Sequence, residues 1–239
     1  MAAGRGLLLC AVLTSSLFPR SLCGQRGSPR DSLVPEFAWT TDSVTALAGL
    51  PTLRGTVLAP GIRREIRMWV GFGRLMPNLL LRVADSSGSV VGLGVAWWPG
   101  GPEPEGRFVG TPAQEAAYKQ EWLRNTQKIR EYVLRSYQCS ALRRGSHTEV
   151  CFIQAEGSHE FVTLLTQIDS LDAWHLRDPS ELTPPGTIGL DGTTLMVEVR
   201  TASGYRTYSY WEPGDGPWPE AKRAGSLARL VFGAFPRRE

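Results

Sequence analysis

Residues 79–98 read LLLRVADSSGSVVGLGVAWW and decide the fold, because their pattern is that of a β-hairpin. Leu79, Leu81 and Val83 occupy alternate positions, so they lie on one face of a strand. The segment Asp85–Ser89 has the composition of a turn. Beyond it, apolar residues occupy the odd positions from 91 to 97. A hairpin joins antiparallel strands, so this stretch predicts an antiparallel sheet.

Two glycines stand on the opposite face of the second arm of this hairpin. Gly92 and Gly94 alternate with the apolar residues of the strand. A glycine within a strand leaves room for another backbone or an aromatic ring to approach closely. We therefore expect the sheet to be tightly covered at this point.

Further strands are predicted on both sides of the hairpin. Residues 65–72 alternate with a period of two, and so do residues 195–200 and 205–211, which are joined by the turn Ser203-Gly204. A short strand is expected over residues 149–155, preceded by a basic turn at Arg143-Arg144-Gly145. The pattern allows no prediction for residues 40–61.

Three helices are predicted. Thr111 is a suitable N-cap for a helix that begins at Pro112 and runs to about Tyr137, and Gln114 completes a capping box. A second helix follows Ser158, and a third begins near Pro219. We expect an α+β fold, an antiparallel sheet built from hairpins with about three helices packed on one face.

The N-terminal residues have the layout of a secretory signal peptide. Arg5 precedes an apolar run at 7–18, and small residues stand before a cleavage point after Cys23. The run is shorter than the roughly 20 residues that span a bilayer. We expect residues 1–23 to be the signal peptide, 24–36 a disordered linker and 37–236 one domain with a possible sub-boundary in loop 99–110. No transmembrane segment is expected after the leader, and Arg20 and Leu22 do not fit lipidation of Cys23.

Charge and motifs exclude several classes of function. The formal net charge is +3, and loss of Arg5 and Arg20 with the leader would leave +1, too little for nucleic-acid binding. The three histidines, His147, His159 and His175, lack the spacing of a zinc site. Gly71-Phe72-Gly73 lacks the third glycine of a dinucleotide site. We therefore expect no metal and no cofactor.

Cys139 and Cys151 are the cysteines that remain after removal of the leader. An exported protein meets an oxidising compartment, where two such thiols are expected to form a disulfide. The basic turn between them would bring their Cα atoms within the roughly 4.4–6.8 Å that the bond requires.

One acidic residue is a weak candidate for catalysis. Glu198 lies in the middle of a predicted strand between apolar positions, and burial could raise its pKa for general-acid chemistry. The alternative is a structural pair with Arg206 across the hairpin. The sequence has no Gly-x-Ser-x-Gly motif, and Ser158-His159-Glu160 fits a helix cap, yet a Ser/His pair assembled in space stays open.

Aromatic residues are the strongest indication of a binding site. Consecutive Trp97 and Trp98 point to opposite faces of a strand, so we expect at least one to be exposed. Exposed aromatic rings near glycine-rich loops suit a sugar or peptide ligand. The alternative is that these rings belong to the core. The candidate binding residues are Trp97, Trp98, Tyr208, Tyr210, Trp211 and Trp218.

Several short motifs accompany the cysteine pair. They are Arg64–Arg67, Gly71–Gly73, Ala173–Leu176, Asp191–Thr193, Tyr205–Tyr210 and Pro217–Ala221. In these motifs the chain resembles a group of uncharacterised exported bacterial proteins. The resemblance covers most of the chain after the leader and implies a location in the bacterial periplasm or outside the cell. It implies no activity.

Together these patterns favour an exported, non-enzymatic domain that binds a ligand or supports an envelope structure. The partner is left open between a carbohydrate and a peptide or protein surface. The alternative is an exported hydrolase that uses Glu198 or an unplaced Ser/His pair.

Overall fold

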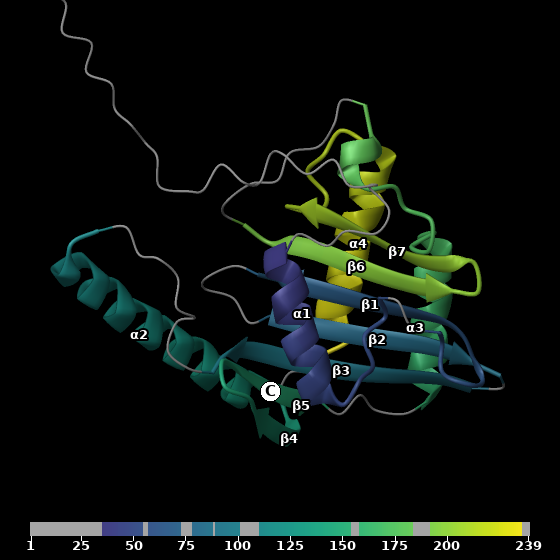
Figure 1. Ribbon diagram of the computed structural model, residues 1–239. Coiled ribbons are helices and arrows are strands. Elements are labelled where there is room, and N and C mark those ends of the chain that lie inside the picture. The colour runs from purple at the N-terminus through teal and green to yellow at the C-terminus, as the bar shows by residue number, and fades with distance from the viewer. Residues whose placement is uncertain are drawn as a thin grey trace, which may run out of the picture.

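A single antiparallel sheet organises the chain. The structure is a computed structural model that describes residues 35–54, 57–72, 78–87, 89–100, 110–153, 158–183 and 192–235. In these residues seven strands lie in the order β4-β5-β3-β2-β1-β6-β7 (Figure 1). The strands are β1 (Ile62–Gly71), β2 (Asn78–Ser86), β3 (Ser89–Pro99), β4 (Cys139–Arg144), β5 (Thr148–Ile153), β6 (Thr194–Thr201) and β7 (Gly204–Trp211).

Helices lie against both faces of the sheet. They are α1 (Pro35–Ala48), α2 (Pro112–Ser136), α3 (Ser158–Ser170) and α4 (Pro219–Gly233), with a short 3₁₀ helix, η2 (Pro179–Glu181). One face is covered by α3, α4 and the end of α2, whereas α1 lies on the other (Figure 1). The predicted α+β class is confirmed. The expectation that helices cover one face is incomplete, because α1 was not predicted.

The hairpin of residues 79–98 pairs as its sequence predicts. Leu79 opposes Ala96, and Ser86 opposes Ser89 at the turn. A Cβ atom on Gly92 would lie 1.8 Å from a ring carbon of Phe161 in α3. A side chain larger than hydrogen would therefore displace the ring, and the expected close approach of an aromatic ring to this strand is confirmed.

Helix α2 begins with the predicted capping box. The Thr111 hydroxyl accepts from the Gln114 amide at 3.3 Å, and the Gln114 side chain accepts from the Thr111 amide at 2.8 Å. Ile129 and Val133 near its end are buried in the core, while Leu123 is exposed. The first half of α2 projects from the rest of the molecule (Figure 1).

Two elements were missed from the sequence. Helix α1 begins at Pro35, inside the segment predicted as a linker, and buries Val44 and Ala48 against the sheet. Strand β4 replaces most of the predicted basic turn and has a register shift between Cys139 and Ala141. The signal peptide 1–23 and most of the linker 24–36 lie outside the described residues, as do residues 101–109 of the loop taken as a possible sub-boundary.

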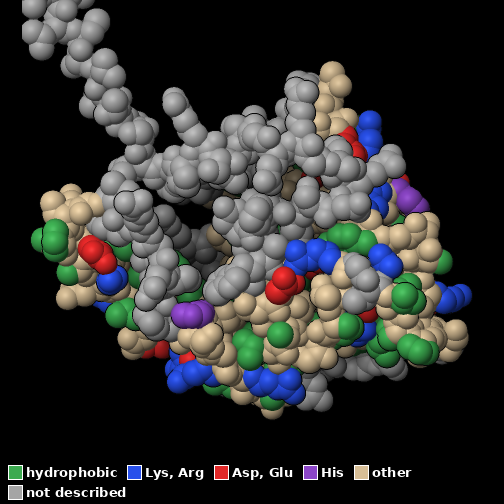
Figure 2. All heavy atoms as spheres, viewed as in Figure 1, with side chains coloured by type: hydrophobic (Ala, Val, Ile, Leu, Met, Phe, Trp, Pro, Cys, Tyr) green, Lys and Arg blue, Asp and Glu red, His purple; other side chains and the backbone are tan. Residues whose placement is uncertain are grey.

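The two faces of the sheet differ in chemistry. The α3/α4 face carries a large apolar cluster that includes Met68, Leu81 and Trp98. The α1 face has a smaller cluster around Trp69 and Trp97, and beside it the buried charged residues Glu65 and Arg67. Figure 2 views the molecule from the α1 side. Basic side chains (blue) gather at its lower edge, where β4 and β5 lie in Figure 1.

Candidate functional site

A hollow of about 260 Å³ lies at the C-terminal end of β7, and we call it the aromatic hollow. It is bounded by three aromatic side chains that the sequence singled out, and two acidic residues also line it. Pro179 of η2 closes one side. The aromatic and acidic residues of the aromatic hollow are Tyr210, Trp211, Glu212, Asp215 and Trp218.

A tight reversal of the chain brings these residues together. Glu212 has a φ of 43°, and its amide donates to the Thr193 carbonyl at 2.8 Å. Its carboxylate accepts from the Thr193 amide at 2.7 Å. The Asp215 amide then donates to the Glu212 carbonyl at 3.2 Å. This turn directs the chain from β7 back toward α4, so that Trp211 and Trp218 line the same hollow.

The three rings differ in how they are held. Tyr210 is buried, and its hydroxyl donates to the Arg177 carbonyl at 2.6 Å. The Trp218 indole donates to the Thr183 carbonyl at 3.3 Å. Trp211 keeps 37% of its surface exposed. Tyr210 and Trp218 are thus anchored by hydrogen bonds, and Trp211 presents part of its ring surface to solvent.

Glu212 and Asp215 add hydrogen-bond acceptors to the aromatic side chains of the aromatic hollow. Carboxylates at neutral pH are hydrogen-bond acceptors only, so a ligand that contacts Glu212 or Asp215 must supply donors. An aromatic ring offers a large apolar face that is rigid and costs little conformational entropy to present. The aromatic hollow therefore suits an amphipathic ligand with one apolar face and an edge of hydroxyl or ammonium donors.

A second hollow of about 450 Å³ lies at the other end of β7, and we call it the arginine hollow. It is lined by residues 204–207 of β7, by Val199 and Thr201 of β6 and by residues of the segment 174–181. Arg206 is held there by two backbone carbonyls, since its guanidinium donates to Trp174 at 3.2 Å and also to Leu176.

Four of the six predicted binding residues are buried core residues: Trp97, Trp98 and Tyr208, which line neither hollow, and Tyr210, which also lines the aromatic hollow. Trp97 and Trp98 do point to opposite faces, but they are only 6% and 0% exposed, so the expectation that one is exposed is wrong. Both faces of β3 are covered, by the cluster beneath α3 and α4 on one side and by the cluster beneath α1 on the other. Tyr208 is buried as well, with its hydroxyl donating to the Ala173 carbonyl at 2.6 Å.

The predicted pair of Glu198 with Arg206 is wrong. Glu198 opposes Thr207 in the register of β6 and β7, whereas Arg206 opposes Val199. Directly opposed residues share a face and successive residues alternate, so Glu198 and Arg206 lie on opposite faces of the sheet. Glu198 instead accepts from the Trp69 indole at 2.9 Å and from the Tyr205 hydroxyl at 3.0 Å.

Glu198 is buried in a polar network on the α1 face. Burial raises its pKa, although the charge of Arg67 and the hydrogen bonds from Trp69 and Tyr205 oppose that rise. Among the described residues, its hydrogen-bond donors are an indole and a phenol, and Tyr205 has its own pKa raised, by burial and by Glu198. This arrangement holds the carboxyl group in place, and among the described residues no acid or histidine is hydrogen-bonded to it.

The remainder of this network was not predicted. Arg67, fully buried, donates to the Glu65 carboxylate at 2.9 Å and to the Pro51 carbonyl at 2.7 Å. Arg82 binds both oxygens of Glu65, at 2.9 and 2.8 Å. Burial alone would raise the pKa of Glu65, but these two arginines lower it. The alternation of charged Glu65 and Arg67 with apolar Ile66 and Met68 is typical of a strand with one face in solvent, so the burial of these charges could not be predicted from the pattern.

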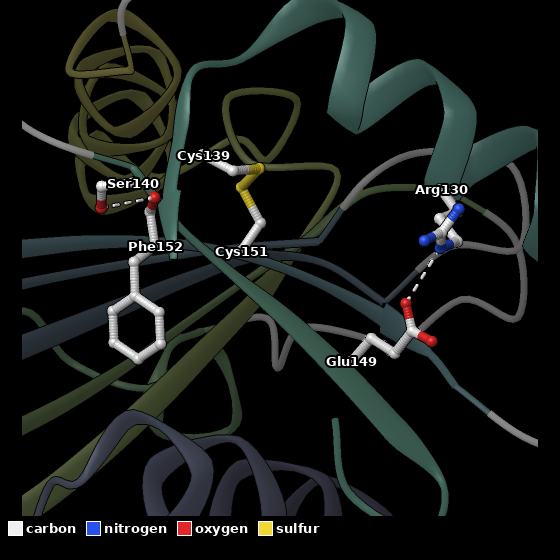
Figure 3. The surroundings of a disulfide bond; sticks show 6 residues. All are labelled: Arg130, Cys139, Ser140, Glu149, Cys151 and Phe152. Atoms are coloured by element: carbon white, nitrogen blue, oxygen red, sulfur yellow. Dashed lines mark hydrogen bonds and ion pairs between the residues drawn. A yellow bond between two sulfur atoms is a disulfide. The ribbon is translucent and has the colours of Figure 1, made fainter. Parts of the chain in front are cut away.

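The predicted disulfide is confirmed. Cys139 and Cys151 are bonded, with their Cα atoms 5.3 Å apart (Figure 3). Cys139 begins the edge strand β4, and Cys151 is a core residue of the neighbouring strand β5. In β4, residues 140–144 are exposed. The disulfide therefore ties an exposed edge strand to the core.

Within the described part of the chain, no three His, Cys, Asp or Glu side chains are grouped so as to hold a metal ion. None of the described helices is long and apolar enough to cross a membrane. Comparison with protein-family models, curated proteins and solved structures found no match.

Proposed function

We propose that the chain is an exported, non-enzymatic binding domain and that the aromatic hollow is its saccharide-binding site. The observation that carries this proposal is the convergence of Tyr210, Trp211 and Trp218 on one hollow together with Glu212 and Asp215. The disulfide and the resemblance to exported bacterial proteins support the proposed location.

A saccharide fits the chemistry of the aromatic hollow. One face of a sugar ring presents C–H groups, which can stack on an exposed indole such as that of Trp211. The hydroxyl groups at the ring edge are donors, and carboxylates accept the stronger, charge-assisted hydrogen bonds. Trp218 and Tyr210 are held by hydrogen bonds before any ligand arrives. Side chains that are already held in place lower the entropic cost of binding a ligand.

The rival hydrolase is less well supported. Its candidate acid, Glu198, is buried and lines neither the aromatic nor the arginine hollow. A general acid must reach the proton it transfers, directly or through one water. The hydrogen bonds from Trp69 and Tyr205 favour a structural role for Glu198 instead.

The proposal is tested by titration calorimetry of the full exported chain against a panel of neutral oligosaccharides. We expect Trp211→Ala to weaken binding at least about tenfold, because stacking on the exposed indole is lost. Asp215→Asn should weaken it less, because a neutral amide oxygen replaces a charged acceptor. Trp122→Ala, on α2 and outside the aromatic hollow, removes the same residue type and should leave the affinity unchanged.

Two outcomes would contradict the proposal. A panel without any bound saccharide would do so, as would equal losses in Trp211→Ala and Trp122→Ala. The same titrations include a quaternary ammonium compound and a proline-rich peptide, since aromatic rings also bind these ligands. Selective binding of either one through Trp211 would replace the saccharide by that class.

Export is tested separately by mass spectrometry of the secreted protein. We expect an N-terminus near Gly24 or Gln25, because the predicted signal peptide ends at Cys23. Recovery of the full-length chain from the cytosolic fraction would contradict the proposed location.

A further inference from the structure

The charged side chains that line the aromatic hollow are both acidic. Glu212 and Asp215 line it, and among the described residues no lysine, arginine or histidine does so. Within the described part of the chain, neither carboxylate forms an ion pair. The aromatic hollow therefore presents two negative charges beside its rings.

Two arginines act electrostatically on Tyr210 of this hollow, and each is paired with another acid. Arg177 donates to the Glu220 carboxylate at 3.0 Å, and Arg223 donates to the Asp172 carboxylate at 3.2 Å. The pKa of Tyr210 is raised, by burial first and then by acidic neighbours, and these two arginines oppose the rise. Because both arginines are paired, they add little positive charge to balance the two carboxylates of the hollow.

A third carboxylate lies at the border of the aromatic hollow. Asp178 directly precedes Pro179, which closes one side of it. The Asp178 side chain accepts hydrogen bonds from the amides of Ser180 at 2.9 Å and Ser209 at 3.0 Å. These neutral donors orient the carboxylate without removing its charge, so Asp178 adds to the negative potential at this end of β7.

The two lining acids are placed by the turn that follows β7. Glu212 Oε1 accepts from the Thr193 amide at 2.7 Å, and no described donor is bonded to Oε2. A Cβ atom on Gly192 would lie 1.9 Å from Glu212 Oε1, so a larger residue there would displace this carboxylate. Asp215 belongs to the same turn and is exposed to solvent. Glu212 Oε2 and the Asp215 carboxylate can therefore accept from a ligand.

The chain as a whole has the opposite charge. Its formal net charge is +3, and it stays positive if the predicted leader is removed. A net positive charge attracts anions at long range. A preference for a cationic ligand would therefore come from a local site and not from the overall charge of the protein.

An ammonium group matches what the aromatic hollow offers. It has three hydrogen-bond donors and no acceptor, and its bonds to carboxylates are charge-assisted. Tryptophan is also the best aromatic partner for a cation, and Trp211 keeps 37% of its surface exposed. A hydroxyl or an acetylated amine lacks the charge that both interactions use.

We propose that the ligand of the aromatic hollow is a saccharide with unacetylated amino groups, such as an oligomer of glucosamine. One sugar ring stacks on Trp211, and its ammonium group donates to Glu212 and Asp215. This inference rests on the proposed saccharide site and adds the charge of the ligand to it.

The test compares an oligomer of glucosamine with its fully N-acetylated form, which has the same backbone without the charges. The titrations are made at about pH 6, where the amino groups are largely protonated and side-chain carboxyl groups are ordinarily ionised. At low salt, the wild-type chain should bind the amine at least about tenfold more tightly than the acetylated form. The preference should shrink at about 0.5 M salt, which screens exposed charges.

Variants of the two acids locate the preference. Asp215→Asn and Glu212→Gln keep the size of each side chain and remove its charge, so each should reduce the ratio of the two affinities at least about threefold. Glu121, on α2, is an exposed acid outside the aromatic hollow. Glu121→Gln removes the same charge and should preserve the ratio. An equal reduction in Glu121→Gln and Asp215→Asn would mean attraction by overall charge and would overturn the inference.

The remaining outcomes separate this inference from the proposed function. If the wild-type chain binds the acetylated form as tightly as the amine, the amino-sugar assignment fails while the saccharide site stands. This comparison needs no variant, so it decides the matter even if Glu212→Gln fails to fold. If neither oligomer binds and the neutral panel also fails, the proposed function fails with it. Tighter binding of a lysine oligomer of equal charge than of the glucosamine oligomer would overturn the assignment to a sugar.

Discussion

The two faces of the sheet are stabilised in different ways, although both are buried. On β1, Ile66 and Met68 point into the apolar cluster beneath α3 and α4, while Glu65 and Arg67 point to the α1 side. Burial of apolar surface stabilises the first face in proportion to its area. Burial of charge is unfavourable unless the charges are paired and hydrogen-bonded. The comparison teaches that depth of burial alone does not say how a face contributes to stability.

We call the α1 side of the sheet, with its buried residues Glu65, Arg67 and Glu198, the charged face. It also fixes the register in which β1 pairs with its neighbours. A shift of one residue would exchange the faces of every side chain on that strand. Such a shift would place Glu65 and Arg67 in the apolar cluster, away from Arg82 and from the Pro51 carbonyl that bind them. We infer that the network contributes more to the choice of register than to net stability.

The largest expected effect comes from breaking the charged face. Glu65→Gln should lower the free energy of unfolding by about 3–5 kcal/mol, because it removes the carboxylate to which the fully buried Arg67 donates. Ile66→Val, the next residue on the same strand, should cost only about 0.5–1.5 kcal/mol on the apolar face. Urea denaturation of both variants measures the difference directly.

A combined replacement checks the cause of that loss. Glu65→Leu together with Arg67→Met and Arg82→Met removes the hydrogen-bonded ion pairs of Glu65 as a group, so that neither arginine is left without its carboxylate. We expect most of the lost stability to return, since apolar residues of similar volume replace buried ion pairs with little cost. A loss of less than about 1 kcal/mol in Glu65→Gln would contradict the importance of pairing on this face.

The disulfide between Cys139 and Cys151 is a covalent contribution to stability, which can be compared with the non-covalent contributions of the two faces. Replacing Cys139 and Cys151 by Ala should lower the free energy of unfolding by about 3 kcal/mol at most, the chain-entropy value for so short a loop. Residues 140–144 of β4 are exposed, so besides the disulfide this edge strand is held mainly by its pairing with β5 and by polar contacts. Denaturation of the double variant measures the loss, and hydrogen exchange should show it concentrated in β4 and β5. Unchanged exchange in β4 would contradict this role.

The sequence predicted the fold where local signals were strong. The hairpin of residues 79–98 and the capping box at Thr111 depend on neighbours in the chain, so their patterns sufficed. Helix α1 was missed because its apolar residues show only a weak helical stripe. Strand β4 was missed because its residues are mostly exposed and basic, which resembles a turn.

The candidate site was only half predictable for a similar reason. Trp211 and Trp218 were identified by residue type, but their convergence depends on the turn at Glu212 and on the Thr193 backbone that holds it. At least one of Trp97 and Trp98 was expected to be exposed, because alternation predicts the face on which a side chain lies and not what covers that face. The partner of Glu198 was misplaced because the register of β6 and β7 is a tertiary property.

The smallest expected effect concerns two glutamates of the charged face whose pKa values shift in opposite directions. The pKa of Glu65 is lowered, so the stability it contributes is present above its unfolded pKa and is lost as the pH falls. Burial raises the pKa of Glu198, so the folded state holds its proton more tightly than the unfolded chain does. Stability therefore falls as the pH rises upward from the ordinary value of 4.5 through the raised pKa of Glu198.

Glu198→Gln removes this second dependence and leaves the first. At about pH 4, where Glu198 is largely protonated in the folded chain, we expect the variant to be less stable by about 1 kcal/mol or less, because the amide replaces the carboxyl group imperfectly between Trp69 and Tyr205. At about pH 7 the difference should be smaller or reversed, since only the wild type keeps an acid there whose ionisation burial opposes. Urea denaturation at both pH values measures it, with the exposed Glu181→Gln as the control. If the variant instead became less stable relative to the wild type as the pH rises, the folded chain would favour ionised Glu198. The pKa values of Glu65 and Glu198 would then both be lowered by folding, which would contradict their opposite shifts.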